Sequence, residues 1–369
     1  MKTANDEHYM QMAVQEARKG QGRTSPNPCV GAVIVKNGKL VSKGYHKKAG
    51  TPHAEINAIT ASGSVDLAGA TIYVTLEPCS HTGRTPPCCE ALVSAGFSRV
   101  VVGMTDPNPR VNGRGISFLR RHGIAVDTGL LEKRCVELNY PFIKHVTQGT
   151  PWMIMKAGVS LDGRLNYQAG KSGWITGEES KKEVHRLRDV VDGIMVGSAT
   201  AIIDNPSLTT RLNDKKGKDP VRIILDSHLA VPLSSTIFNQ ESSAPVWLVC
   251  GKNVSNEKTA RFRDKNIEII QVDGDENGLD LRQVLTVLGK RDICSVLVEG
   301  GARLHGAFLR KRLYDYAHLF YAPLFAGDRG VPLVSSFEVK DRESAPRLEH
   351  PQMKRLGEDF MVSGKILYP

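Results

Sequence analysis

The chain has 369 residues, enough for two domains of ordinary size, and its 40% hydrophobic and 24% charged residues are a balance typical of soluble globular proteins. No run approaches about 18 apolar residues, and residues 1–7 lack the apolar core of a signal peptide, so we expect neither a membrane span nor export. The seven cysteines are an odd number, which favours a reducing, cytoplasmic setting over a disulfide framework.

The net charge of +10 is compatible with two classes of partner. A basic protein can bind nucleic acid, or it can attract small substrates that carry phosphate groups. The basic residues are spread along the chain and aromatic residues make up 6% of it, so no basic run with interleaved aromatic residues is available to stack bases. We therefore expect a small phosphorylated substrate rather than nucleic acid.

The first half of the chain alternates predicted helices and strands, which indicates an α/β sandwich with a mixed sheet. Thr51 is expected to cap a helix that begins at Pro52. The run 70–76 is rich in β-branched residues and predicts a strand, and a second helix is expected from about Thr85 to Gly96. The other predicted elements are helices over 8–19, 115–122 and 133–146, the last with a break at 140–141, and strands over 30–36, 39–44, 99–103 and 125–127.

Three metal-ligand residues and one carboxylate fall at the ends of these elements. His53 and Glu55 lie at the first helix start, Cys79 follows the strand, and Cys88 lies in the first turn of the second helix. Two thiolates and one imidazole suit Zn²⁺, and three protein ligands leave a position for water, whose pKa zinc lowers from about 16 to about 7. Glu55 is placed to carry a proton from that water to a leaving amine, which is the chemistry of a hydrolytic deaminase.

Alternatives remain for these residues. The thiols could be buried apolar side chains, or Cys89 could complete a closed structural zinc site. Adjacent helical residues point about 100° apart, so only one of Cys88 and Cys89 can readily face a given metal. The gap from Cys79 to Cys88 is longer than in the P-C-x-x-C deaminase signature, and it places His81 and Arg84 where they can contact a charged substrate group. His81 could instead be a fourth zinc ligand.

A second α/β pattern follows a predicted linker over 147–151. No G-x-G-x-x-G follows a strand, so a Rossmann dinucleotide site is not supported. Glu299-Gly300-Gly301 turns a buried strand into a helix, where backbone N–H groups can hold a phosphate, although a plain tight turn explains the glycines equally well. The predicted elements are strands over 152–157, 193–197, 221–225, 246–250, 268–272, 295–299 and 319–322, and helices over 178–189, 281–288 and 301–310, with Asp280 as N-cap of the second helix and Gly289 as its end.

Segments along nearly the whole chain resemble the bifunctional deaminase–reductase of riboflavin biosynthesis. They occur in the expected order, at 26–33, 50–55 and 75–89 in the first half and at 156–164, 173–176, 204–211 and 298–301 in the second. The resemblance implies an α/β chain with a cytidine-deaminase-like three-layer domain over 1–147 and a dihydrofolate-reductase-like domain over 151–369 that binds NADPH. It also makes a homodimer or homotetramer plausible.

The resemblance implies two reactions on a phosphorylated pyrimidine. The first domain would deaminate 2,5-diamino-6-(5-phosphoribosylamino)pyrimidin-4-one with Zn²⁺, and the second would reduce the ribosyl group of the product with hydride from NADPH. In the first site, the proton carrier is Glu55, the metal ligands are His53, Cys79 and Cys88, the pyrimidine contact is Asn27 unless it is only a turn residue, and the phosphate contacts are drawn from His46, His81 and Arg84.

In the second site, the resemblance assigns substrate and cofactor contacts. Arg188 and Arg211 suit the substrate phosphate because a guanidinium fork matches phosphate oxygens. Trp174 could instead be a core residue, and Lys156 and Asp162 lie in a family-like segment without an assigned role. The substrate contacts are Ser172, Arg188, Leu208, Arg211 and Glu299; the cofactor contacts are Gly158, Trp174, Thr200, Asp204, Ser227 and Gly301.

Two other functions compete with this interpretation. A nucleic-acid base deaminase with an accessory domain would share the zinc motif, but it leaves the segment between Cys79 and Cys88 and the motifs of the second domain unexplained. A noncatalytic zinc module would need no proton carrier, so replacing Glu55 would cost it nothing.

Overall fold

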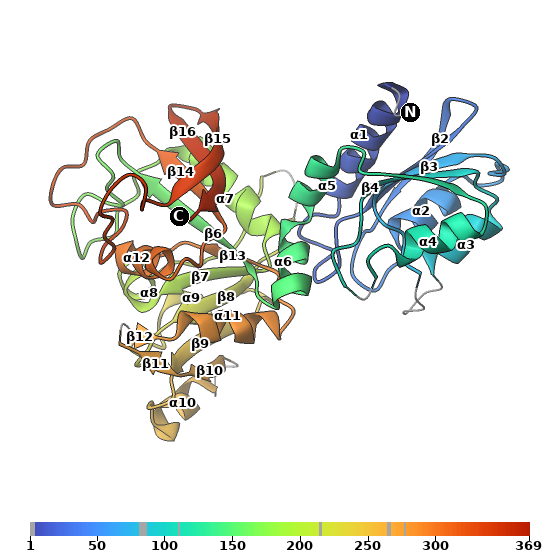
Figure 1. Ribbon diagram of the computed structural model, residues 1–369. Helices are drawn as coiled ribbons and strands as arrows, with labels where there is room; N and C mark the ends of the chain where they lie inside the picture. The colour runs from blue at the N-terminus through green and yellow to red at the C-terminus, as the bar shows by residue number, and fades with distance from the viewer. Residues whose placement is uncertain (1–3, 81–86, 110, 214–215, 264–266, 277) are drawn as a thin grey trace. The chain divides into compact units, whose positions relative to one another are not determined.

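The computed structural model describes residues 4–80, 87–109, 111–213, 216–263, 267–276 and 278–369 (Figure 1). The chain divides into two compact units, Met1–Gly149 and Thr150–Pro369. Within the described ranges, no helix combines the length and the apolar character needed to cross a membrane.

The first unit is built on a five-stranded mixed sheet. Its order is β2-β1-β3-β4-β5, in which β1 runs antiparallel to β2 and β3, while β3, β4 and β5 are parallel. The strand β3 is buried along nearly its whole length, as its β-branched sequence predicts. The strands are β1 (Gly31–Lys36), β2 (Lys39–Tyr45), β3 (Thr71–Leu76), β4 (Arg99–Met104) and β5 (Ala125–Thr128).

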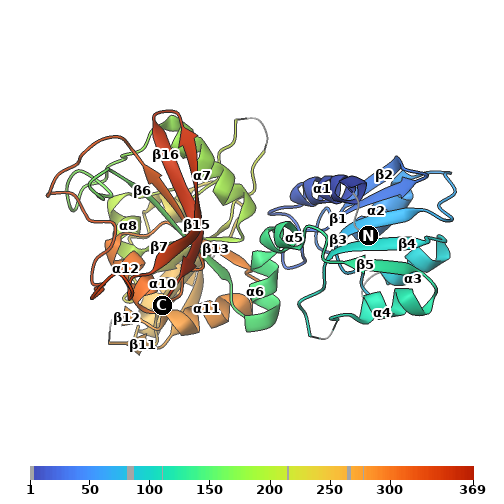
Figure 2. The same ribbon diagram turned by 45° about the horizontal axis from the view of Figure 1, so that its top comes forward.

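Helices cover both faces of this sheet and give three layers (Figure 2). Gly31 and Gly44 face opposite sides, and each lets a helix approach the strands. A Cβ atom on Gly31 would lie 2.0 Å from the carbonyl oxygen of Ala13 in α1, and one on Gly44 would lie 2.3 Å from the backbone nitrogen of Ala58 in α2. The helices are α1 (Ala4–Arg18) and α5 (Glu132–Leu138) on one face, α2 (Ala54–Ala61), α3 (Cys88–Ser94) and α4 (Arg114–Arg121) on the other, and then α6 (Tyr140–Gln148).

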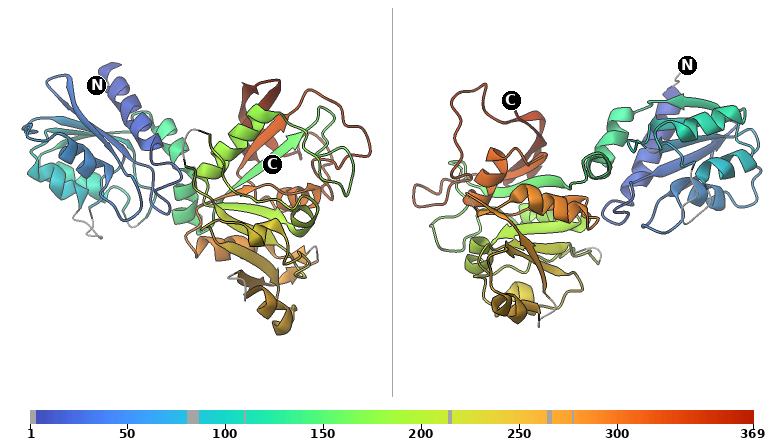
Figure 3. Two further views of the ribbon diagram at one scale, coloured as in Figure 1. Left: turned by 180° about the vertical axis from the view of Figure 1, so that it is seen from behind. Right: turned by 60° about the horizontal axis from the view of Figure 1, so that its bottom comes forward.

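The second unit is built on a nine-stranded mixed sheet of order β10-β9-β8-β7-β13-β6-β14-β16-β15, which Figure 3 shows from two further sides. All neighbouring strands in the part β10-β9-β8-β7-β13-β6-β14 are parallel to one another. Strand β16 runs antiparallel to both β14 and β15. The strands are β6 (Trp152–Val159), β7 (Gly193–Gly197), β8 (Val221–Leu225), β9 (Val246–Gly251), β10 (Glu268–Val272), β13 (Ser295–Val298), β14 (Tyr316–Tyr321), β15 (Arg347–Leu356) and β16 (Asp359–Leu367), with a separate pair β11 (Gly274–Asp275) and β12 (Gly278–Leu279).

Successive residues of the central strands serve two different cores. Met195 and Ile223 pack with residues of α11 and α12, whereas their neighbours Ile194 and Ile224 pack with residues of α8, α9 and α10. Both sides of the parallel strands are therefore covered, as continuous apolar runs predict. The helices are α7 (Glu178–Val190), α8 (Ser198–Ile203), α9 (Thr236–Asn239), α10 (Asn256–Arg263), α11 (Leu281–Gly289) and α12 (Ala302–Arg310).

The predicted helix ends are partly confirmed. Asp280 caps α11, because its side chain accepts hydrogen bonds from the backbone N–H groups of Arg282 (2.9 Å) and Gln283 (3.3 Å). The prediction that Thr51 caps α2 is wrong. The hydroxyl of Thr51 closes a turn by donating to the carbonyl of Lys48 at 2.6 Å, and His53 is the N-cap residue. The metal-ligand histidine therefore stands just before the helix rather than within its first turn.

Candidate active sites

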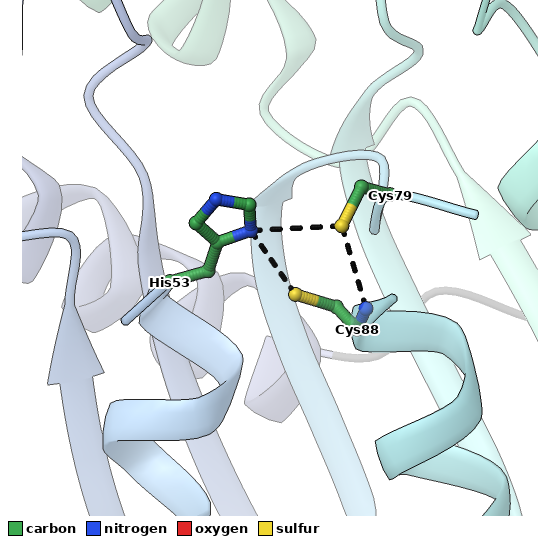
Figure 4. Close-up of side chains that lie close together, drawn as sticks. All are labelled: His53, Cys79 and Cys88. Atoms are coloured by element: carbon green, nitrogen blue, oxygen red, sulfur yellow. Dashed lines mark hydrogen bonds between the residues drawn. The ribbon is translucent and has the colours of Figure 1, made fainter. Parts of the chain in front are cut away.

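His53, Cys79 and Cys88 converge from three elements of the first unit (Figure 4). The His53 Nδ1 atom lies 3.2 Å from Cys88 Sγ and 3.6 Å from Cys79 Sγ, and the backbone N–H of Cys88 donates to Cys79 Sγ at 3.3 Å. The ligand atoms all lie within 4.8 Å of one another. Two thiols and an imidazole at this spacing fit one tetrahedral Zn²⁺ with a position left for water.

Cys89 points away from this group. Its Sγ atom donates to the carbonyl oxygens of Pro78 at 3.3 Å and Gly115 at 3.6 Å. The prediction that only one of the adjacent cysteines faces the metal site is thus confirmed, and that residue is Cys88. The alternative of His81 as fourth ligand, like the expected contact from Arg84, lies outside the described residues.

We expect the two cysteines to differ in a zinc-binding assay. Cys88→Ser removes a ligand atom and should reduce bound zinc to well under one ion per chain after dialysis. Cys89→Ser keeps all three ligands and should retain zinc at the wild-type level. Metal content measured by atomic emission distinguishes the two variants, and equal zinc loss in both would contradict the assignment of Cys88.

The surroundings of the two cysteines favour ionisation of the Cys79 thiol and oppose ionisation of the Cys88 thiol. Hydrogen bonding with Cys88 and with His53 lowers the pKa of Cys79. Contact with Cys79 and burial raise the pKa of the Cys88 thiol. A divalent cation would allow both cysteines to be thiolates at once, because a coordinating thiol is deprotonated by the metal charge. The pair is therefore suited to a cation.

Glu55, the second residue of α2, is buried beside the ligands, with 3% of its surface exposed. It is consequently not an exposed helix carboxylate. Burial and the negative charge of Cys79 raise the pKa of Glu55 to about 7. A carboxyl group with a pKa in that range can both accept and release a proton near neutral pH.

Asn27 and His46 also lie beside the metal-ligand group. The rings of His46 and His53 are 5.4 Å apart between centroids. His46 Nδ1 lies 3.1 Å from the carbonyl oxygen of Pro52, and its Nε2 lies 3.2 Å from Asn27 Nδ2. Because a carbonyl only accepts, Nδ1 carries the proton and Nε2 accepts from the Asn27 amide. Burial lowers the pKa of His46, which agrees with this neutral form.

The second unit contains a cavity of about 970 Å³. It is lined by residues from β6, β7, α7, α8 and α12, from the end of β8, the β11–β12 pair and the start of α11, and from neighbouring loops. All the residues that the sequence assigned to substrate and cofactor binding in this half lie on its wall: Gly158, Ser172, Trp174, Arg188, Thr200, Asp204, Leu208, Arg211, Ser227, Glu299 and Gly301.

A buried carboxylate with two cations forms one wall of this cavity. Arg188 donates to Glu299 through Nε at 2.7 Å and Nη2 at 2.9 Å, and Lys156 Nζ lies 3.4 Å from the same carboxylate. Burial opposes ionisation of Glu299, but Arg188 and Lys156 outweigh it and lower the pKa to about 2. Arg188 Nη1 donates to the carbonyl of Thr209 at 3.0 Å, so this guanidinium also holds the loop that carries Arg211.

Trp174 is an exposed part of the cavity wall. Half of its surface is exposed, which contradicts the alternative that it is a core residue. Two ammonium groups lie near its ring: Lys156 Nζ is 5.3 Å and Lys181 Nζ is 5.6 Å from the ring centroid. These cation–π contacts help to hold the indole in place at the cavity wall.

The comparisons with known proteins cover both units. Residues 3–104 match the "cytidine and deoxycytidylate deaminase zinc-binding region", and residues 151–362 match the "RibD C-terminal domain". The riboflavin biosynthesis protein RibD of Aquifex aeolicus is 41% identical over 97% of each chain. The chain belongs to the RibD family of riboflavin biosynthesis proteins.

Two solved structures extend this similarity to the fold. Acinetobacter baumannii RibD superposes with a TM-score of 0.87 at 34% identity, over 98% of this chain and 99% of that chain. A diaminohydroxyphosphoribosylaminopyrimidine deaminase/5-amino-6-(5-phosphoribosylamino)uracil reductase from Thermotoga maritima gives 0.86 at 35% identity, over 98% of each chain. The two-domain α/β fold and the bifunctional deaminase–reductase activity are thus confirmed, with a zinc-binding deaminase domain and a RibD reductase domain that implies NADPH.

The structure also brings residues into the reductase cavity that the sequence left without a role. His185 lies on the wall, and its Nδ1 accepts the backbone N–H of Arg211 at 3.2 Å. Burial, followed by the charges of Arg188 and Arg211, lowers the pKa of His185 to about 4, so the ring is neutral at neutral pH. His185 lies three residues before Arg188 in α7, so both side chains are on one face of the helix. That spacing is the feature of the sequence that indicates a place for His185 in the same cavity.

Asp162 has a structural role in this RibD chain. Its carboxylate accepts hydrogen bonds from the Ser160 hydroxyl at 2.5 Å and from the backbone N–H groups of Ala326 and Gly327 at 2.9 and 2.8 Å. It therefore joins the loop after β6 to the loop after β14, and both loops frame the cavity region.

Proposed function

We propose that the first unit hydrolytically deaminates 2,5-diamino-6-(5-phosphoribosylamino)pyrimidin-4-one and that the second reduces the resulting 5-amino-6-(5-phosphoribosylamino)uracil to its ribitylamino product with NADPH. The observation that carries the first half is the buried Glu55 beside a three-ligand group. The 35% identity to the Thermotoga maritima protein, over 98% of each chain, supports the choice of substrates.

In the first site, His53, Cys79 and Cys88 would hold Zn²⁺, which supplies an acidified water when bound. Glu55 is the group of this chain that can hold a proton beside the ligands, and its carboxylate would pass that proton to the departing amine. Asn27 binds the pyrimidine edge through its amide oxygen and the second hydrogen of its amide nitrogen, since the bond to His46 uses only one of the two N–H donors. His46 thereby orients Asn27, and a phosphate contact falls to other residues.

In the second site, NADPH would supply the hydride, and the cavity residues hold cofactor and substrate together. Gly158, Trp174, Thr200, Ser227 and Gly301 line the cofactor, with Asp204 at its ribose. Ser172, Leu208 and Glu299 contact the sugar chain of the substrate. Arg188 is occupied by Glu299 and Thr209, so Arg211 is the better phosphate ligand.

Two assays on the purified full chain test the proposal. The zinc-loaded protein should release ammonia from the diaminopyrimidine substrate and not from tRNA or cytidine. With the deaminated product it should then oxidise NADPH in equal molar amount. An absence of ammonia release with zinc bound would overturn the deaminase half, and an absence of substrate-dependent NADPH oxidation would overturn the reductase half.

Arg211→Ala should raise the reductase KM for the phosphorylated substrate by about 10- to 100-fold, the loss expected for a charged hydrogen bond worth about 1.5–3 kcal/mol. Arg211 is held by Ser207 and Thr209 through Nη1 and remains exposed, so its loss should leave the fold intact. Arg186→Ala is the matched control, since Arg186 pairs with Glu183 outside the cavity. An equal KM increase with the dephosphorylated substrate would argue against a phosphate contact.

We also propose that the chain acts as a homodimer or homotetramer in the cytoplasm without binding nucleic acid. Support for the small-molecule partner is the cavity of the second unit, which is lined by cations and an indole. Light scattering measures the assembly, and salt-dependent binding of tRNA would contradict the last part.

A further inference from the structure

Glu77 is a buried carboxylate two residues before the zinc ligand Cys79, and only 4% of its surface is exposed. Four backbone N–H groups from one later segment donate to it. Asp106 (3.1 Å) and Gly113 (2.9 Å) donate to Oε2, and Gly115 (2.9 Å) and Ile116 (3.2 Å) donate to Oε1. A carboxylate offers about four acceptor positions, so this side chain is saturated by one segment.

The two residues that follow Glu77 are held just as closely. A Cβ atom on Gly115 would lie 2.1 Å from the Pro78 carbonyl oxygen, so only glycine lets the start of α4 approach this peptide. The Cys89 thiol donates to the same oxygen at 3.3 Å, and the Cys89 N–H donates to the Cys79 carbonyl at 3.1 Å. The segment 77–79 is therefore fixed by α4 on one side and by α3 on the other.

We infer that Glu77 is a positioning residue for the metal site: its four bonds to residues 106, 113, 115 and 116 hold the exit of β3 so that Cys79 meets His53 and Cys88. Only one residue, Pro78, separates Glu77 from Cys79, and the proline ring restricts the backbone at that position. A shift of the Glu77 carboxylate is therefore passed to Cys79 Sγ. The inference rests on the proposed deaminase function for the identity of the metal.

A purely stabilising role is the competing explanation. A carboxylate at the start of α4 favours the helix through its dipole and unpaired N–H groups. That role predicts a loss of stability alone. Positioning predicts, in addition, weaker metal binding and altered ligand geometry, as measured for other groups that orient metal ligands.

The test compares Glu77→Gln with Asp6→Asn. Asp6 is a buried carboxylate of the same unit that accepts from Tyr73 Oη at 2.7 Å and from Arg99 Nη1 at 2.9 Å, with no metal ligand among these partners. Both variants exchange one buried carboxylate for an amide. Zinc affinity is measured by competition with a chromogenic chelator, ligand geometry by the thiolate charge-transfer bands of the Co²⁺-loaded protein, and stability by Tm.

We expect both variants to lower Tm, and Glu77→Gln alone to weaken zinc binding by about 10- to 100-fold and to shift the Co²⁺ bands. Hydrogen exchange in the apo chain should accelerate at the amides of 106, 113, 115 and 116 in Glu77→Gln only. Wild-type zinc affinity and bands in Glu77→Gln would overturn the inference, and so would an equal loss of affinity in Asp6→Asn.

Glu77→Asp provides a second variant if the glutamine variant does not fold. It keeps the charge but is one methylene shorter, so it cannot span to all four N–H groups, and zinc affinity should fall several-fold. Unchanged affinity in this variant would also overturn the inference. A wild-type chain that binds zinc tightly but releases no ammonia would refute the proposed substrate alone, whereas a wild-type chain that binds no zinc would refute both.

Discussion

Glu55→Gln is expected to lower the deaminase kcat by at least about 100-fold while bound zinc and reductase activity stay at the wild-type level. General acid–base catalysis by one side chain contributes about 10²- to 10⁴-fold, and glutamine cannot carry the proton. The substitution keeps the size of the side chain, and Glu55 is not one of the three residues whose ligand atoms converge. Single-turnover ammonia release at saturating substrate measures the effect on the chemical step.

Glu90→Gln is the matched control. Glu90 lies in the first turn of α3, two residues after Cys88, but it is exposed, so the same change of charge and shape should leave deamination unaffected. Deaminase activity above half of wild type in Glu55→Gln would show that another group moves the proton. Loss of zinc together with activity would show that Glu55 supports the metal site instead.

The metal-ligand residues can be identified from the sequence because their chemistry is carried by residue type. Histidine and two cysteines at element ends indicate zinc, and the 100° step between adjacent helical residues is enough to separate Cys88 from Cys89. Glu77 carries no such sign. Its partners are the backbone N–H groups of residues 106, 113, 115 and 116, and such groups are present at every position that is not proline.

The fold likewise contains elements that the sequence predicts and elements that it does not. Buried strands such as β3 and β13 are rich in β-branched and apolar residues and are predicted from the sequence, whereas the hairpin of β15 and β16 is not predicted. The strand β15 is mostly exposed and contains His350, Lys354 and Arg355, so it lacks the apolar alternation typical of a strand; it forms by pairing with β16. The pairing of Arg188 with Glu299 likewise spans 111 residues, a separation at which sequence spacing gives no contact.

That pairing leads to the second large effect. Glu299→Gln should destabilise the second unit by about 3–5 kcal/mol, because removing one partner of a buried ion pair leaves its cations without compensation. The Glu299 and Arg188 side chains are 10% and 8% exposed, so water cannot replace the lost charge at either group. The reductase kcat/KM should also fall by at least about 100-fold, a loss of about 2.7 kcal/mol, while deamination by the other unit continues.

The stability loss caused by Glu299→Gln should depend on pH, whereas a stability loss caused by a packing defect should not. The folded-state pKa of Glu299 is lowered from 4.5 to about 2, so its ionised form stabilises the fold fully above about pH 4.5 and loses that contribution as the pH falls toward 2. The difference in unfolding free energy between wild type and Glu299→Gln should therefore shrink across that window.

Glu183→Gln is the matched control: Glu183 also pairs with two cations, Arg186 and Lys354, but lies outside the cavity. It should keep full reductase activity, and a comparable loss in Glu183→Gln would assign the effect to general destabilisation of α7 rather than to the buried ion cluster.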